Sequence, residues 1–78
     1  MRNGTRTAQV MEAIRGQIAS RALDVGDRLP SIRGFAAAMK VSPSTVVEAY
    51  DRLAAEGIIF ARRGAGFFVA DMAQPFAV

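Results

Sequence analysis

The stretch VSPSTVVEAYDRLAAEG, residues 41–57, carries the signals of a single helix with both ends marked. Pro43 suits the first helical turn, where no amide hydrogen is needed, and the hydroxyl of Ser42 is placed to cap the free amides. Gly57 ends the helix, because the residue after the last turn often takes a positive φ. Apolar residues between these ends recur every three or four positions and predict one buried face, made of Val46, Ala49, Tyr50, Leu53 and Ala54.

The first turn of this predicted helix is short, polar and not needed for the buried face. Its side chains are small, and most carry a hydroxyl: Ser42, Ser44, Thr45 and Val47. Such side chains let a helix approach DNA closely and can bond to phosphates or base edges. A capped amphipathic helix is common in small domains, so a purely structural role stays open for the helix alone. The segment that follows favours insertion into a major groove.

Residues 58–69 predict a β-hairpin directly after the helix. Ile58 to Arg63 and Phe67 to Val69 have the composition of two short strands, and Gly64-Ala65-Gly66 supplies the turn. We expect Ile59 and Phe68 to face the core, with Phe60 as a further candidate.

Two arginines, Arg62 and Arg63, stand beside this glycine turn. The glycines are not a phosphate-binding loop, because no Lys-Ser/Thr pair follows and no strand leads into a helix. A basic hairpin tip beside a recognition helix favours contact with a minor groove or the phosphate backbone. A solvated hairpin without a ligand is the alternative.

The N-terminal part of the chain predicts a structural helix and a connector. The helix runs from about Thr7 to Arg21, with Thr5 or Thr7 as its cap, and its apolar stripe is Val10, Met11, Ile14 and Ile18. The connector, residues 23–30, contains a turn at Gly26. We expect Asp27 to Leu29 to form a very short strand, and the apolar side chains of the connector to pin it to the core: Leu23, Val25 and Leu29.

Residues 31–39 predict a second short helix that leads into the first one described. Ser31 is a natural cap, and one face is apolar: Ile32, Phe35, Ala36 and Met39. Lys40-Val41 is then the turn between the helices, with Val41 expected to be buried. Arg33 lies in the first turn, where a cation is unfavourable with the helix dipole. A bound phosphate would compensate, and a solvated arginine is the alternative.

Composition sets the class of protein. Seventy-eight residues allow one small domain, which we assign to residues 1–70, with 71–78 as the start of a linker to a domain not present here. The chain has no cysteine and no histidine, which excludes zinc sites built on those ligands, thiol chemistry and a serine–histidine triad. A net charge of +3 mildly favours a polyanionic partner. No segment predicts a signal peptide or a membrane span, and we expect a cytoplasmic protein.

The run GDRLPSIRGFAAAMKVSPSTVVEAYDRLAAEGIIFARRGAGFFV, residues 26–69, resembles the winged helix-turn-helix domain of GntR-type bacterial transcription regulators. The Ser-Thr-Val-Val-Glu-Ala-Tyr run is most similar to the MocR branch. In that branch the domain precedes an aminotransferase-like domain that binds pyridoxal phosphate. The resemblance therefore implies no cofactor in this segment, and pyridoxal phosphate in a missing C-terminal domain.

By position, the resemblance implies DNA contacts from three places in the chain: Arg33, then Ser42, Pro43, Ser44, Thr45 and Val47, then Arg62, Arg63, Gly64 and Gly66. Lys40 and Arg52 are additional candidates for phosphate contact. Three residues depart from the family pattern. Arg21 and Lys40 replace common glycines in turns, where a left-handed conformation costs a side chain about 1 kcal/mol. Pro43 replaces a residue that reads DNA in many relatives.

These observations together predict a mainly α fold with a small β-hairpin, a winged helix-turn-helix of three helices plus wing. The expected function is sequence-specific binding of double-stranded DNA, with helix 42–56 in the major groove and wing 58–69 on the backbone or minor groove. One copy offers few base contacts, so we expect two copies on paired half-sites, with dimerisation through parts not present. A winged helix used for protein contact is the alternative. No enzyme activity and no small-molecule substrate are expected in this segment.

Overall fold

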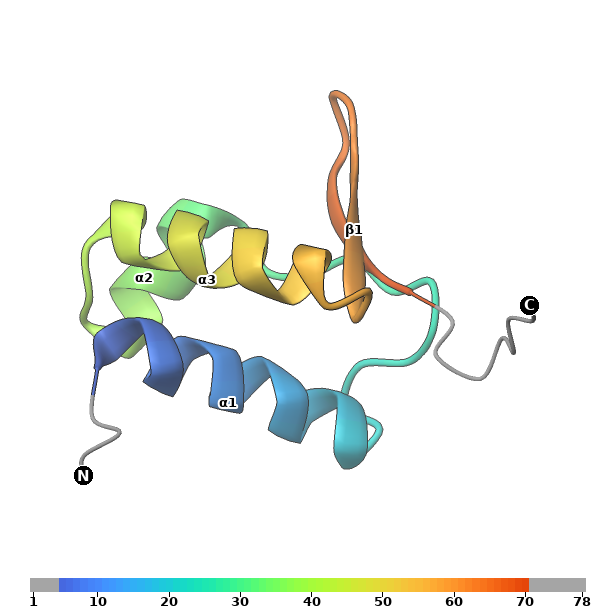
Figure 1. Ribbon diagram of the computed structural model, residues 1–78, viewed down its shortest axis with the longest axis horizontal. Helices are drawn as coiled ribbons and strands as arrows, with labels where there is room; N and C mark the ends of the chain where they lie inside the picture. The colour runs from blue at the N-terminus through green and yellow to red at the C-terminus, as the bar shows by residue number, and fades with distance from the viewer. Residues whose placement is uncertain (1–4, 71–78) are drawn as a thin grey trace.

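The computed structural model describes residues 5–70 and confirms the predicted fold. Three helices, α1 (Arg6–Ala19), α2 (Ile32–Met39) and α3 (Pro43–Ala55), precede a hairpin of β1 (Ile59–Arg62) and β2 (Gly66–Val69). The helix α1 runs alongside α3, α2 lies behind α3, and the hairpin projects from the C-terminal end of α3 on the side away from α1 (Figure 1). The predicted linker, residues 71–78, lies outside the described residues.

The first helix begins and ends close to its predicted bounds. The Thr5 hydroxyl accepts a hydrogen bond from the Ala8 amide at 3.0 Å, so Thr5 is the cap. The helix ends at Ala19, two residues before the predicted end. Arg21 has φ 69°, a left-handed conformation that glycine adopts without cost, so the backbone geometry of a glycine is kept with an arginine in its place.

The turn between α2 and α3 also places a non-glycine residue in the left-handed conformation. Ser31 caps α2 by accepting from the Gly34 amide at 3.0 Å. Lys40 then takes φ 60°, and the Val41 amide donates to the Ala36 carbonyl at 3.0 Å. Val41 is only half-buried, which corrects the prediction of full burial.

The cap of α3 differs from the expectation in one respect. Ser42 precedes the helix with an extended backbone, Pro43 occupies its first position and Gly57 follows its end with φ 80°, as predicted. The Ser42 hydroxyl, however, caps no amide. It lies 3.1 Å from the Ser44 hydroxyl and 3.0 Å from the Thr45 hydroxyl, so the three hydroxyls satisfy one another.

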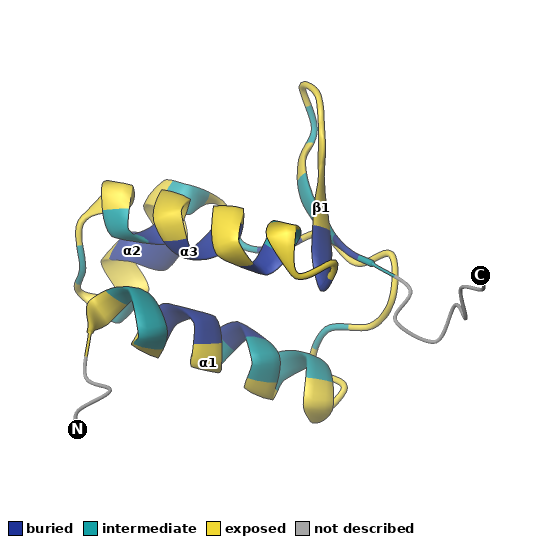
Figure 2. Cartoon of the chain, viewed as in Figure 1, coloured by how far each residue is buried: buried dark blue, intermediate teal, exposed yellow. Residues whose placement is uncertain are grey.

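The core lies between α1, α2, the inner face of α3 and the base of the hairpin (Figure 2). The predicted stripes supply it, because their period of 3.6 residues places them on one side of each helix. The largest side chains that are fully buried, each less than 2% exposed, are Val10, Ile14, Val46, Tyr50, Leu53, Ile59 and Val69. No helix within residues 5–70 has the length and hydropathy needed to cross a membrane.

The connector touches the hairpin through one isolated β-bridge. Arg28 forms an antiparallel bridge with Phe68, and the Leu29 amide donates to the Phe67 carbonyl at 2.8 Å. The strand predicted at Asp27 to Leu29 is thus reduced to a single bridge at Arg28, and Leu29 is buried as expected. Val25, in contrast, is 59% exposed, so the expectation that it pins the connector was wrong.

The hairpin turns a different set of aromatic side chains toward the core from the set predicted. Ile59 pairs with Val69 and both are buried. Alternation then turns the next pair, Phe60 and Phe68, to the other side of the sheet, where their rings stack. Phe67 packs against the buried Tyr50 instead. The predictions that Phe60 and Phe68 face the core were therefore wrong, and Phe67 does so.

Candidate nucleic-acid interface

The start of α3 presents most of the residues that the sequence singled out. Ser42, Pro43, Ser44 and Val47 are all exposed, and Val47 keeps 40% of its surface accessible. Thr45 is half-buried and its hydroxyl is engaged by Ser42. Because a hydroxyl both donates and accepts, Ser44 can still bond to a base edge or a phosphate, and Val47 can contact a thymine methyl.

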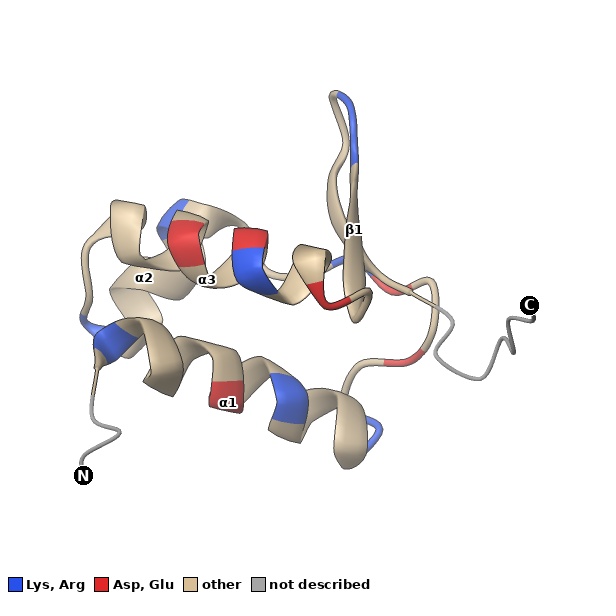
Figure 3. Cartoon of the chain, in the orientation of Figure 1, with Lys and Arg blue, Asp and Glu red and all other residues tan. Residues whose placement is uncertain are grey.

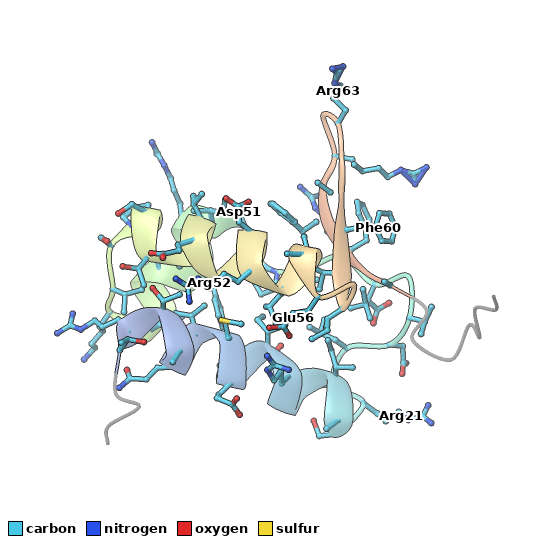
Figure 4. All side chains as sticks on the ribbon, viewed as in Figure 1. Arg21, Asp51, Arg52, Glu56, Phe60 and Arg63 are labelled. Atoms are coloured by element: carbon cyan, nitrogen blue, oxygen red, sulfur yellow. The ribbon has the colours of Figure 1, made fainter. Side chains whose placement is uncertain are left out.

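The same side of α3 carries an acidic residue that the sequence reasoning left out of the site. Asp51 lies one turn beyond Val47 and two turns beyond Ser44 on α3. Its side chain points to the side from which the hairpin projects (Figure 4). Asp51 is exposed and forms no ion pair with another described residue. The helical spacing of residues 44, 47 and 51 could have revealed this position.

Arg52, which the sequence offered as an additional phosphate ligand, is already engaged. Its guanidinium donates to the Glu48 carboxylate at 3.0 Å, one turn earlier on α3. Glu48 also accepts from the Thr7 hydroxyl of α1 at 3.4 Å. A phosphate would have to compete with this carboxylate for Arg52, which makes Arg52 the weaker candidate.

The hairpin places its two arginines differently. Arg63 stands at the tip and points away from the helices (Figure 4). The Arg62 guanidinium lies 5.9 Å from the centre of the Phe68 ring, on the face shared with Phe60, which Figure 4 shows on the side away from α3. The stacking on an aromatic ring restrains Arg62 while leaving its donors free.

Three other exposed cations complete the basic surface. Arg33 is exposed in the first turn of α2, and Lys40 is exposed in the turn between α2 and α3. Arg28, at the β-bridge to Phe68, is also exposed and was not predicted to bind DNA. None of these three forms an ion pair with any residue in the described range 5–70. Within the described residues, unpaired basic residues therefore occur in α2, in the turn and along the hairpin, whereas α3 carries exposed acidic residues together with the paired Arg52 (Figure 3).

Tyr50 fixes the helices that hold this surface. Its ring is buried in the core, and its hydroxyl donates to the Pro30 carbonyl at 2.9 Å, just before α2 begins. Burial raises the pKa of Tyr50 to about 12, because the phenolate would lose its hydration. The hydroxyl therefore stays protonated and remains a donor throughout the physiological pH range.

The described residues form a helix-turn-helix followed by a hairpin. Residues 5–70 contain no group of three metal-ligating side chains, and the sequence holds no histidine or cysteine. What they contain is a helix-turn-helix with a polar, exposed start to its last helix, followed by a hairpin with a basic tip. This combination defines a winged helix-turn-helix domain of the kind that binds nucleic acid.

The family model for bacterial regulatory proteins of the gntR family matches residues 6–69, and the chain belongs to this family. It is 36% identical over 66 residues to the uncharacterized HTH-type transcriptional regulator YhcF of Bacillus subtilis, spanning 85% of this chain and 54% of that protein. The probable rhizopine catabolism regulatory protein MocR of Rhizobium meliloti is 39% identical over 64 residues, 82% of this chain and 13% of that protein. Regulators from other branches of the family match as well, so the MocR branch is one of several represented.

Among solved structures, the DNA-binding domain of AraR in complex with operator ORR3 superposes with a TM-score of 0.80. The match covers 90% of each chain at 25% identity. The chain spans about half, or less, of the length of the curated relatives it matches. The matched proteins are transcriptional regulators, which agrees with the expectation that this domain is not an enzyme.

Proposed function

We propose that this domain binds double-stranded DNA for a bacterial transcription regulator, with the start of α3 in the major groove and the hairpin on the adjacent backbone or minor groove. The observation that carries the proposal is the exposed, uncharged turn of Ser42, Pro43 and Ser44 at the start of α3, which follows α2 with its exposed Arg33 and precedes the hairpin with its arginine tip along the chain. In this arrangement the centre can approach base edges while the flanks neutralise phosphates.

The contacts divide into two groups. Arg33, Lys40, Arg62 and Arg63 hold phosphates, and Gly64 and Gly66 allow the hairpin backbone to come close to the DNA. Ser44 and Val47 meet base edges, with Thr45 supporting Ser44 through the Ser42 hydroxyl. Four neutralised phosphates give a slope of about −4 when the logarithm of the binding constant is plotted against that of the salt concentration.

Specific regulation needs more contacts than one copy offers. We propose that two copies act on paired half-sites and are brought together by parts of the parent protein outside these residues. If that parent is MocR-like, it also carries a pyridoxal phosphate domain outside these residues. The cytoplasm is the compartment in which such a bacterial regulator works.

The test is fluorescence anisotropy of the 78-residue chain on random-sequence duplex DNA over a range of salt concentrations. We expect binding that falls steeply with salt, and a slope shallower by about two in the Arg62→Ala, Arg63→Ala double variant. Arg6→Ala, which removes a cation from the start of α1, is the matched control and should keep the slope. Absence of binding at low salt, also in a tethered tandem copy, would refute DNA binding.

A winged helix used for protein contact is the competing function, because a basic hairpin can equally meet an acidic protein. A variant of Ser44 distinguishes the two functions. Ser44→Ala should weaken preference for a selected DNA site and leave binding to random DNA almost unchanged, since its hydroxyl carries no charge. A protein-contact domain would show no DNA site preference to lose.

A further inference from the structure

A shallow depression of about 180 Å³ lies between the start of the hairpin strand β2 and the segment that leads into α2. Arg28, Pro30, Ser31 and Ile32 line one side, and Gly66 and Phe67 line the other. Its floor is mostly apolar, and the guanidinium of Arg28 supplies the charge at its rim. The depression thus joins the two basic parts of the surface, α2 and the hairpin.

Arg28 is held at this rim by the sheet. Its backbone pairs with Phe68, and because the neighbouring Leu29 is buried, alternation turns the Arg28 side chain outward. The side chain passes directly over Gly66, where the Arg28 Nε lies 3.2 Å from the position that a Cβ atom on Gly66 would occupy. A glycine at this point lets the arginine cross the strand closely.

A second arginine flanks the same glycine. Arg62 is the cross-strand partner of Gly66 in the hairpin register. Neither Arg28 nor Arg62 has a carboxylate within 4.0 Å among residues 5–70. The neighbouring carboxylate in sequence, Asp27, instead accepts from the Asp24 amide at 2.8 Å. The Arg28 guanidinium at Gly66, with no carboxylate within 4.0 Å among residues 5–70 to neutralise it, favours an anion beside it.

We propose that this depression receives one deoxyribose-phosphate unit of the DNA backbone, with Arg28 as the phosphate ligand. The apolar floor at Pro30 and Ile32 suits the sugar, and an arginine fork matches the geometry of a phosphate. Arg28 then continues the line of phosphate contacts from Arg33 in α2 to Arg62 in the hairpin. The inference rests on the proposed DNA binding and adds a fifth phosphate contact to it.

The experiment compares Arg28→Gln with Arg21→Gln by anisotropy on random-sequence duplex DNA between 50 and 200 mM salt. Both variants remove one exposed arginine, but Arg21 stands just after the end of α1, far from the hairpin tip (Figure 4). For Arg28→Gln we expect weaker binding at every salt concentration and a slope shallower by about 0.9. The ratio of the binding constant of the unchanged chain to that of Arg28→Gln should therefore fall about 3.5-fold across this range, because the salt concentration changes fourfold. Arg21→Gln should keep the slope.

Arg28→Lys keeps the charge and should recover the slope, while losing part of the affinity because a lysine offers no fork. Circular dichroism and thermal unfolding would confirm that the variants remain folded. An unchanged slope in Arg28→Gln, or an equal change in Arg21→Gln, would overturn the assignment of Arg28 while leaving DNA binding intact. Failure of the unchanged chain to bind any DNA would instead refute the proposed function itself, and the inference with it.

Discussion

The ring of Tyr50 meets the ring of Phe67 edge-on, with 5.1 Å between their centres and 70° between their planes. Tyr50 belongs to α3 and Phe67 to the second strand of the hairpin, so this contact holds the wing against the recognition helix. An edge-to-face pair adds about 1 kcal/mol to the burial of the two rings. Through its hydroxyl Tyr50 also reaches the Pro30 carbonyl before α2. One side chain thus positions both flanks of the DNA-binding surface.

Tyr50→Phe should lower the free energy of unfolding by about 1 kcal/mol at neutral pH, because the Pro30 carbonyl loses its donor. At alkaline pH the order of the two stabilities should reverse, because the tyrosine protein then loses more than the roughly 1 kcal/mol by which it leads. The folded state holds the phenol proton up to about pH 12, whereas the unfolded chain releases it near pH 10. The stabilisation that comes from this proton is therefore complete below pH 10 and is lost as the pH rises toward 12.

The size of that loss is about 2–3 kcal/mol for a shift of about two units. Urea unfolding of both chains at pH 8, 10 and 11.5 would measure it. The phenylalanine variant controls for the ionisation of all other groups. If the free energies of unfolding of the two proteins changed in parallel with pH across this range, the role given to the burial of Tyr50 would be contradicted.

Gly66→Ala should destabilise the domain by about 1–3 kcal/mol, since φ of 108° is unfavourable for any side chain. The added Cβ would also meet the Arg28 side chain at 3.2 Å and displace it. DNA binding at low salt should weaken as well. Gly16→Ala is the matched control. Nothing lies within 4 Å of a Cβ at Gly16 in the middle of α1, so this change should stabilise the helix by about 1 kcal/mol. Thermal unfolding distinguishes the two, and equal effects would contradict the backbone argument.

Lys40→Gly should stabilise the domain by about 0.5–1 kcal/mol. The gain comes from relieving the left-handed conformation at φ 60°, and it is reduced by the greater entropy of glycine in the unfolded chain. Lys40→Ala removes the same charge but keeps the strain, so its stability should change little. A stabilisation of equal size in both variants would show that charge, and not backbone conformation, is responsible.

Asp51→Asn should tighten binding to random-sequence DNA about twofold or more at low salt. The reason is that an exposed carboxylate on the groove-facing side of α3 repels the phosphates. The difference should fade as salt screens the charge. Glu12→Gln, on the exposed side of α1, is the control and should leave affinity unchanged. Weaker binding of Asp51→Asn to random DNA would indicate that Asp51 makes a favourable contact with the DNA.

Local patterns were sufficient to predict the helices and the hairpin. Caps, glycines and a period of 3.6 residues act within a few positions of the chain, so Thr5, Ser31 and Gly57 could be placed from sequence. The same holds for the buried stripe of α3. The residues expected to bind DNA around Ser44 and Arg63 are exposed because they lie outside these stripes.

The tertiary structure alone decided which aromatic side chain of the hairpin enters the core. Ile58, Ile59 and Phe60 are consecutive apolar residues, as are Phe67, Phe68 and Val69, so the sequence shows no alternation that would identify one face. Docking of Leu29 and Tyr50 against one side selects Phe67 and leaves Phe60 41% exposed. The position of the Arg28 side chain was also decided by the tertiary structure. Its place over Gly66 depends on pairing between segments about forty residues apart, which no local pattern encodes.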